Sequence, residues 1–471
     1  MTESSLNVFL DGKHAGSIRQ SEQGRHSFTY DADYLASENP TPLSLSMPLS
    51  AIEHGAKNID AFMLGLLPDS PEALERIAKI YDVRSAKNPF ELLRHVGQDA
   101  AGAVQILPLD RTSDDAGSQG DIEWLSESDV GALLRSLEDN SVDWDPGRRT
   151  GRWSLAGAQS KIALHQGPDG RWGIPRDATP TTHILKPAIR GFANHDVNEF
   201  MSLHAARRLG IPSAVSSLRT FPGADQVFIS RRYDRRLENE RWIRIHQEDF
   251  LQANGIKPAL KYQVDGGPGV AKMAETIRRF PLENQSESAR RFFSELVFNV
   301  SIGATDAHAK NYSIVLQGDE AILSPFYDVA SAIPYDLDTP NTTLDSAMKI
   351  GDEYRINAIG TRHWVKAGAS LRIPADEAES IANDIRDRVV DAFFEVAEEV
   401  DKENWAPEGV AKRIASNIEE HYKRHGREGR ARSTEGPAGT GSQDRVPKGD
   451  PDSNGGRFAG KRQSSPEVSL E

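Results

Sequence analysis

A polar loop that follows an apolar helix constrains this chain more than any other part of its sequence. The loop runs from Gly303 to Asn311, GATDAHAKN, and spaces Asp306 and Asn311 as Asp-x-x-x-x-Asn. Before it, apolar residues from Phe292 to Gly303 recur at helical spacing, which predicts a buried helix. A loop that is anchored to a buried helix can hold its polar side chains in a defined place.

The segment after the loop predicts a short β-hairpin that ends beside a second aspartate. Ser313 to Leu316 and Ala321 to Leu323 are the predicted strands, and Asp328 follows them in Phe-Tyr-Asp. Protein kinases use an Asp near the acceptor hydroxyl, and an Asn and a second Asp that bind magnesium. Mg²⁺ prefers oxygen ligands, which Asn311 and Asp328 supply. The pattern therefore predicts phosphoryl transfer with Asp306 as the catalytic residue. A capped loop, in which Asp and Asn bond nearby backbone amides, is the alternative.

Two further segments are candidates for holding phosphate groups. Residues 156–161 begin with small side chains that let the backbone approach an anion closely, and Lys161 adds positive charge. They match neither a Walker loop nor a glycine-rich kinase loop, and a turn that enters a strand is the alternative. Lys186 ends the apolar run that begins at His183, and Glu199 on the following predicted helix could pair with it. A solvated strand end is the alternative for Lys186.

Blocks of sequence along the whole chain carry a family resemblance. GATDAHAKN with PFYD resembles the HipA family, the serine/threonine kinase toxins of bacterial type II toxin–antitoxin modules. The resemblance covers roughly residues 5–420, and so many blocks in one order exclude chance. The other matching blocks are PLSLSMPL from Pro42, LLPDSP from Leu66, GQD from Gly97, GAV from Gly102, SLAGAQSK from Ser154, THILK from Thr182, QED from Gln247 and DGGPG from Asp265.

The resemblance implies an α+β, bilobed protein-kinase-like (HipA-like) fold with an N-terminal subdomain and a helical C-terminal lobe. It implies Asp306 as the catalytic residue, Asn311 and Asp328 as Mg²⁺ ligands, and ATP as the phosphoryl donor. Ser154 matches a serine at which autophosphorylation ejects the phosphate loop and silences the enzyme; an ordinary loop hydroxyl is the alternative. The implied nucleotide contacts are Ala156, Gly157, Ala158, Gln159, Ser160, Lys161, Lys186, Arg231, Arg232, Tyr233, Gln247, His308, Ala309, Lys310, Asn311, Tyr327 and Asp328.

Some of these positions have alternatives of their own. Arg231 stands where many family members carry Glu, so a backbone contact with adenine would be retained there and a side-chain contact would not. Gln247 precedes two acidic residues, as a helix cap often does. His308 is expected to position the loop, because Mg²⁺ prefers oxygen ligands. Lys310 could offset charge on the transferred phosphoryl group.

By the same resemblance, the chain is the toxin of a toxin–antitoxin module. Its expected target is a translation component such as an aminoacyl-tRNA synthetase, whose phosphorylation would arrest growth. A small HipB-like helix-turn-helix antitoxin is the other expected partner. Contact with DNA is expected through the antitoxin alone, because Met348 to Arg355, where some relatives carry a basic loop, is short and mixed in charge. A non-catalytic co-repressor scaffold and a small-molecule kinase are the alternative functions.

Composition narrows the function further. The 471 residues include no Cys, which excludes disulfides, thiolate metal sites and a Cys nucleophile. The formal net charge of −14 disfavours general nucleic-acid binding, which depends on neutralising phosphates. The N-terminus lacks a basic region followed by an apolar core, and no stretch reaches the ~20 apolar residues that span a bilayer. A cytoplasmic enzyme without membrane association is therefore expected.

Changes in composition along the chain predict its parts. A hairpin with an Asp-Gly turn at Asp11 begins the N-terminal subdomain, and helical spacing recurs after residue 374. The final residues bury too little apolar surface to offset their ordering entropy. The predicted parts are 1–108 (N-terminal subdomain), 109–148 (linker and helix), 149–245 (nucleotide-binding part of the kinase core), 246–425 (helical C-terminal lobe with the catalytic loop) and 426–471 (disordered tail).

Overall fold

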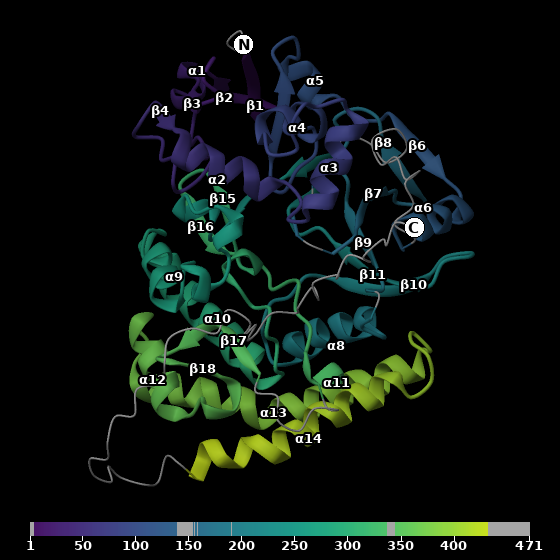
Figure 1. The fold of residues 1–471 in the computed structure, drawn as a ribbon, viewed down its shortest axis with the longest axis vertical. Coiled ribbons are helices and arrows are strands. Elements are labelled where there is room, and N and C mark those ends of the chain that lie inside the picture. Colours follow the sequence, from purple (N-terminus) through teal and green to yellow (C-terminus); the bar gives the residue numbers. More distant parts are fainter. Residues whose placement is uncertain are drawn as a thin grey trace, which may run out of the picture.

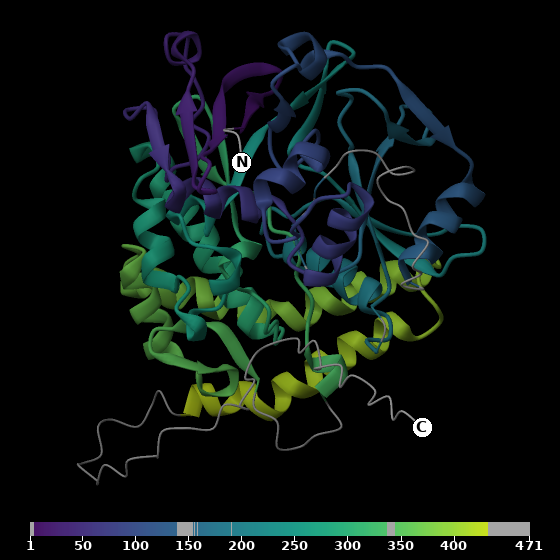
Figure 2. The same ribbon diagram turned by 45° about the horizontal axis from the view of Figure 1, so that its top comes forward.

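Two β-sheets lie side by side above a layer of helices (Figures 1 and 2). The computed structural model describes residues 4–138, 154, 156–157, 159–189, 191–336 and 344–431, with side chains as far as residue 424. Sheet and helix are therefore both major components, as the α+β prediction requires.

The first sheet is antiparallel, with the strand order β4-β3-β2-β1-β5. The predicted Asp-Gly turn is confirmed: Asp11 and Gly12 have φ angles of 48° and 78°, the left-handed region that this tight hairpin turn needs. Phe28, Phe62 and Phe90 are fully buried between the sheet and its helices. The elements are β1 (Ser4–Leu10), β2 (Lys13–Gln20), β3 (His26–Tyr30), β4 (Glu53–Gly55), β5 (Val104–Pro108), α1 (Ala32–Leu35), α2 (Ala56–Leu66), α3 (Pro71–Ile80) and α4 (Pro89–Val96).

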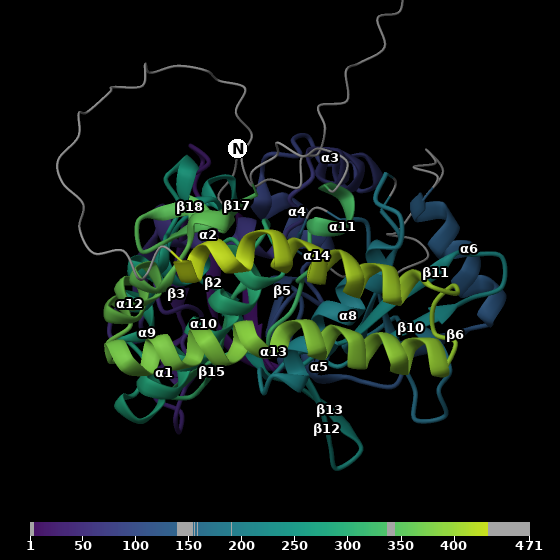
Figure 3. The same cartoon turned by 90° about the horizontal axis from the view of Figure 1, so that it is seen from below.

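The second sheet has the order β10-β11-β9-β7-β8-β6, and helix α6 covers its core with Val130 and Leu134. A protruding hairpin, β12 and β13, follows it (Figure 3). The elements are α5 (Ser113–Gly117), β6 (Ile122–Leu125), α6 (Glu127–Glu138), β7 (Ile162–Gln166), β8 (Trp172–Pro175), β9 (His183–Pro187), α8 (His195–Arg208), β10 (Ser216–Thr220), β11 (Gln226–Arg231), β12 (Arg235–Glu238) and β13 (Arg241–Arg244).

The predicted linker over residues 109–148 needs a correction. Strand β6 pairs antiparallel with β8 at the edge of the second sheet, so this segment extends the sheet instead of only joining two parts. Helix α6, which was expected there, is present as far as Glu138. Strand β6 is short and follows a run of Gly, Ser and Asp, so it shows little of the alternating hydrophobicity that predicts a strand. The sequence pattern therefore did not indicate it.

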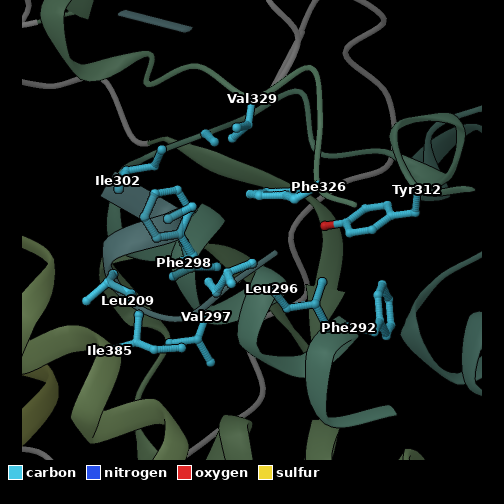
Figure 4. Close-up of a cluster of buried hydrophobic side chains, with 14 of the residues drawn as sticks. Leu209, Phe292, Leu296, Val297, Phe298, Ile302, Tyr312, Phe326, Val329 and Ile385 are labelled. Atoms are coloured by element: carbon cyan, nitrogen blue, oxygen red, sulfur yellow. The ribbon is translucent and has the colours of Figure 1, made fainter. Parts of the chain in front are cut away.

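Helix α10 is the centre of the helical part and carries the apolar run predicted before the loop. Phe298 and Phe326 meet edge to face with ring centroids 6.1 Å apart, inside the cluster of Figure 4. The helix begins at Leu282, earlier than predicted. Its first turns are mostly polar and exposed, so they lack the apolar spacing on which the prediction was based. The remaining elements are β14 (His246–Asp249), η1 (Gln252–Asn254), η2 (Pro258–Leu260), η3 (Gln263–Asp265), α9 (Val270–Ile277), α10 (Leu282–Ser301), η4 (Ala309–Asn311), β15 (Ser313–Gln317), β16 (Glu320–Leu323), α11 (Ile333–Asp336), β17 (Asp345–Ile350), β18 (Glu353–Arg355), η5 (Ile356–Ala358), α12 (Thr361–Ser370), α13 (Ala375–Lys402) and α14 (Val410–Ala431).

Helices α13 and α14 run side by side across the lower face (Figure 3). The predicted tail began at residue 426, but α14 continues to Ala431. Residues 432–471, the rest of that predicted tail, lie outside the described residues. In the part of the chain that the structure describes, no helix combines the length and the apolar character needed to cross a membrane.

A buried ion cluster joins the first sheet to the second. The carboxylate of Asp99 accepts hydrogen bonds from Arg235 at 3.0 Å, Arg244 at 3.1 Å and the hydroxyl of Thr181 at 2.6 Å. Burial alone would raise the pKa of Asp99, but the arginines around it hold that pKa well below its usual range. A carboxylate placed in this way is ionised, buried and fully paired.

Asp99→Asn should destabilise the fold by roughly 3–5 kcal/mol, because removing one partner of a buried ion cluster leaves the other charges uncompensated. Asp384→Asn is the matched control, since Asp384 pairs with Arg388 at 2.7 Å on an exposed helix face. That exposed pair should contribute less than about 0.5 kcal/mol. Urea denaturation of the three proteins measures both effects, and equal losses in the two variants would contradict the structural role of Asp99.

A second buried carboxylate lacks such partners. Glu295 on α10 is 1% exposed, and its Oε1 has no hydrogen-bond partner among the described residues. Burial raises the pKa of Glu295 to about 8, against a smaller opposing effect of Arg291. The side chain is therefore neutral in the folded protein at pH values where an exposed Glu is ionised.

The unfolded chain releases this proton near the ordinary pKa of Glu, whereas the folded protein keeps it to about pH 8. The contribution of Glu295 to stability is thus fully present below the ordinary value and is lost as pH rises toward 8. Glu295→Gln should therefore gain stability relative to wild type between pH 5 and pH 8 in urea denaturation. The exposed Glu379→Gln should show no such relative gain, and a flat difference for Glu295→Gln would refute the assignment.

Candidate active site

The predicted loop and both phosphate candidates meet at one cavity of about 450 Å³ between the two sheets and the helical part. The predicted residues in its lining are Ala156, Gly157, Gln159, Lys161, Lys186, Arg231, Arg232, Tyr233, Gln247, Asp306, His308, Lys310, Asn311, Tyr327 and Asp328. Ser154, Ser160 and Ala309 are not part of that lining, and Ala158 lies outside the described residues. Residues far apart in the sequence therefore face one space.

The polar loop begins where α10 ends, and its backbone folds back on Asp306. The carbonyl of Asp306 accepts from the backbone N–H of His308 and from the side-chain amide of Asn311, both at 2.8 Å. The amide nitrogen of Asn311 thus closes the loop by donating to a backbone carbonyl, which differs from the capped-loop alternative, in which Asp and Asn bond backbone amides. Its side-chain oxygen has no hydrogen-bond donor among the described residues and is available for a cation. The carboxylate of Asp306 is 37% exposed and faces the cavity.

Lys186 lies at the back of the cavity between two carboxylates. Its Nζ is 2.6 Å from Glu199 on α8 and 2.5 Å from Asp328. The solvated strand end is therefore wrong for this lysine, which is buried, and the expected pairing with Glu199 is confirmed. Burial alone would lower the pKa of Lys186, but Asp328 and Glu199 raise it above its ordinary value.

Asp328 has a φ of 56°, an uncommon left-handed conformation for a residue with a side chain. Enclosure in the cavity would raise its pKa, but Lys186 and Lys161 hold that pKa well below the usual range. The carboxylate is therefore ionised. Backbone strain at an ionised side chain in a cleft is typical of a functional position.

The phosphate candidate segment carries a lysine that no carboxylate of the described residues contacts directly. The Nζ of Lys161 donates to the carbonyl of Ala156 at 2.8 Å, and burial lowers its pKa to about 8. Gly157 has a φ of +109°, which favours glycine, and its carbonyl accepts from Asp69 N–H at 3.2 Å. Ser154 is buried, and its hydroxyl donates to the carbonyl of Leu66 at 2.7 Å. The first subdomain thus holds the start of this segment and the serine that precedes it.

The ion cluster fixes residues 231–233, which the family resemblance places at the nucleotide. Arg232 is buried and pairs with Asp234 at 2.8 Å, so its side chain holds the fold together, and Arg231 is exposed. Tyr233 donates its hydroxyl to Gln247, which lies in strand β14 and is therefore not a helix cap. The rings of Tyr233 and Tyr327 are 5.9 Å apart. Their aromatic surfaces suit a planar base.

Three lining residues have no role in the sequence analysis. Asp69 forms ion pairs with Lys310 and, at 3.4 Å, with Lys261, and Tyr262 donates its hydroxyl to Asp306. Burial would raise the pKa of Asp69, but both lysines lower it. Asp69 lies in the LLPDSP block, and Lys261 and Tyr262 lie a few residues before the DGGPG block. The only sequence signal for these three residues is that they lie in or near blocks that match the family. Nothing in the spacing of those blocks indicated that the residues line this cavity.

The oxygen donors suit a hard divalent cation. Among the described residues no group of three or more His, Asp or Glu side chains could hold a metal ion. Mg²⁺ commonly takes one or two protein oxygens and completes its shell with phosphate and water. Asn311 and Asp328 fit that requirement, since the first offers an amide oxygen and the second an ionised carboxylate. His308 is a poor ligand for such a cation.

Comparisons with known proteins agree with this geometry. Residues 6–107 match the HipA N-terminal domain, and residues 153–393 match the HipA-like C-terminal domain. The protein Y4mE of Sinorhizobium fredii is 34% identical over 367 residues, which cover 77% of this chain and 85% of that protein. The serine/threonine-protein kinase toxin HipA of Shewanella oneidensis is 28% identical over 397 residues, which cover 79% of this chain and 86% of that protein.

The fold also matches a solved structure. HipA in the Shewanella oneidensis complex of HipA, HipB and operator DNA superposes with a TM-score of 0.74. The match covers 90% of this chain and 97% of that chain at 23% identity. At that identity the likeness establishes the fold, which is the bilobed kinase-like fold predicted from the sequence.

Proposed function

This chain belongs to the HipA family, and we propose that it is a serine/threonine protein kinase that transfers the γ-phosphoryl group of ATP to a protein. The observation that carries the proposal is the convergence of Lys186, Glu199, Asp328, Asp306 and Asn311 on one cavity. A Lys–Glu ion pair, a metal-binding Asp, a metal-binding Asn and a second Asp are the parts that protein kinases require.

Each side chain has a separate task in this proposal. Asp306 orients the acceptor hydroxyl and accepts its proton, since it faces the cavity and is partly exposed. Lys186 holds a phosphate oxygen while Glu199 keeps the lysine in place. Mg²⁺ bound by Asn311 and Asp328 would offset the negative charge on the phosphate oxygens.

The rest of the cavity wall binds the nucleotide. The ammonium group of Lys161 is half-buried and contacts no carboxylate among the described residues, so a phosphate would supply the missing charge. Gly157 lets the backbone approach that phosphate closely. Tyr233 and Tyr327 hold the base, and Lys310 offsets charge on the transferred group from its place beside Asp69.

The proposal includes partners that follow from the family. The relative of known structure was solved with HipB and operator DNA. We infer a small helix-turn-helix antitoxin for this chain, DNA contact through that antitoxin, and a cytoplasmic target such as an aminoacyl-tRNA synthetase. Phosphorylation of such a target would halt translation and arrest growth.

Asp306→Asn and Asp328→Asn should each lower phosphate transfer by at least about 100-fold, because the first loses the acid–base group and the second a charge needed in the transition state. Both should also abolish growth arrest while the chain stays folded. Asp319→Asn, in the exposed turn after β15, is the matched control and should keep full activity. The measurement is incorporation of labelled phosphate from ATP into this chain and into lysate proteins.

Wild-type turnover in a folded Asp306→Asn protein would defeat the kinase proposal. Absence of transfer by the wild type would favour the non-catalytic co-repressor scaffold. Label that enters small molecules and no protein would favour a small-molecule kinase.

Phosphate on Ser154 should lower nucleotide affinity by about tenfold or more. The hydroxyl is buried against Leu66, and the N–H of Ser154 donates to Asp99 at 3.0 Å, so the pocket has no room for a phosphate. The added charge of about −1.5 to −2 would expel the segment and repel ATP. The test incubates wild type with Mg-ATP, maps phosphorylated residues by mass spectrometry and measures nucleotide binding.

Ser154→Ala is the control for that experiment, because it cannot accept phosphate at this position and should keep its nucleotide affinity through the same incubation. Prolonged incubation without phosphate on Ser154 would refute the assignment. Unchanged affinity in the phosphorylated wild type would refute the mechanism of inactivation.

A further inference from the structure

We propose that Tyr262 is a positioning residue that fixes the carboxylate of Asp306 for proton acceptance, an inference that rests on the proposed kinase function. The hydroxyl of Tyr262 donates a hydrogen bond to Oδ1 of Asp306. His308 lies near the same oxygen, with its Nε2 3.8 Å away. Both groups therefore face Oδ1, and the proposal assigns Oδ2 to the acceptor hydroxyl.

Asp306 needs such a partner because little else holds its side chain. It is 37% exposed, and 3.8 Å is too long for a hydrogen bond from His308. An exposed carboxylate without a donor can rotate between several orientations. Misplacement of a catalytic group by about 1 Å can cost about 100-fold in rate. One directed hydrogen bond on Oδ1 removes that freedom.

Tyr262 is itself held in place by the turn that follows it. Its carbonyl accepts from the N–H groups of Asp265 at 3.1 Å and Gly267 at 3.0 Å. A Cβ atom on Gly267 would lie 2.1 Å from the carbonyl oxygen of Leu260, so the turn requires glycine there. The next residue, Gln263, accepts from the N–H of Lys349 on β17 at 2.7 Å. The turn is thus tied to a neighbouring strand.

The ring of Tyr262 has two neighbours that restrict it. It meets the ring of His308 edge to face at 5.0 Å, and the ammonium of Lys261 lies 5.5 Å from its centroid. Lys261 pairs with Asp69, which also holds Lys310 in the catalytic loop. With its ring restricted in this way, the Tyr262 hydroxyl acts as a fixed hydrogen-bond donor.

Tyr262→Phe removes the hydroxyl and keeps both ring contacts. We expect the maximal rate of autophosphorylation to fall by about 10- to 100-fold. The half-saturating ATP concentration and the Kd for ATP should stay within about twofold of wild type, because Tyr262 contacts Asp306 and not the phosphate segment. Tyr354→Phe is the matched control, since the ammonium of Lys349 lies 5.2 Å from the Tyr354 ring, and it should leave all three quantities unchanged.

Crystal structures of wild type and Tyr262→Phe provide a readout that does not depend on turnover. The proposal expects the Asp306 carboxylate to point Oδ1 at the hydroxyl in wild type and to rotate or become disordered in the variant. An unchanged Asp306 in the variant, an unchanged maximal rate, or a rise in rate would each overturn the inference. Failure of the proposed function is a different result, because it would appear as absence of transfer by the wild type itself.

Discussion

The buried carboxylate of Asp99 is the interaction on which the active site depends. Its side chain binds Arg235 and Arg244 of the β12–β13 hairpin, and its backbone carbonyl accepts from Ser154 at the start of the phosphate segment. One residue of the first subdomain therefore fixes two walls of the cavity. Since ions in a protein interior must be paired to be tolerated, this cluster favours the docking in which Asp99 of the first subdomain meets the β12–β13 hairpin.

That docking brings the first subdomain into the chemistry. Helix α2 ends just before Asp69, which reaches the catalytic loop through Lys310 and the DGGPG region through Lys261. The backbone of Asp69 also binds Gly157. The first subdomain is thus part of the candidate site and more than a cover for it, because its Asp69 is the carboxylate that pairs with both lysines.

Charge in the cavity is arranged before any ligand binds. Lys186 is paired with two carboxylates, whereas Lys161 has a carbonyl as its direct partner and a pKa lowered to about 8. An anion that enters the cavity meets Lys186, which two carboxylates hold in place, and Lys161, whose charged form a negative neighbour would stabilise. Such preorganisation stabilises charge without reorganising the protein during the reaction.

Local sequence patterns predicted the elements that short-range rules control: the Asp-Gly hairpin at Asp11, the two strands that follow the loop, and the buried part of α10. The Asp-x-x-x-x-Asn spacing also predicted that Asp306 and Asn311 are neighbours in one loop. Two residues five positions apart in a short loop cannot lie far from each other. Edge strand β6 was missed because it is short and its residues show no clear alternation.

The sequence by itself determined the local chemistry of this protein: which loop carries the acid and amide groups, where a second aspartate follows, and which family the blocks resemble. Tertiary structure alone decided that Asp69 and Tyr262 complete that loop's surroundings, because they come from separate elements and meet it only when the sheets dock on the helices. Long-range contacts of this kind leave no periodic trace in a single chain. Their energy depends on burial and on pairing of charges across elements, and both exist only in the folded state.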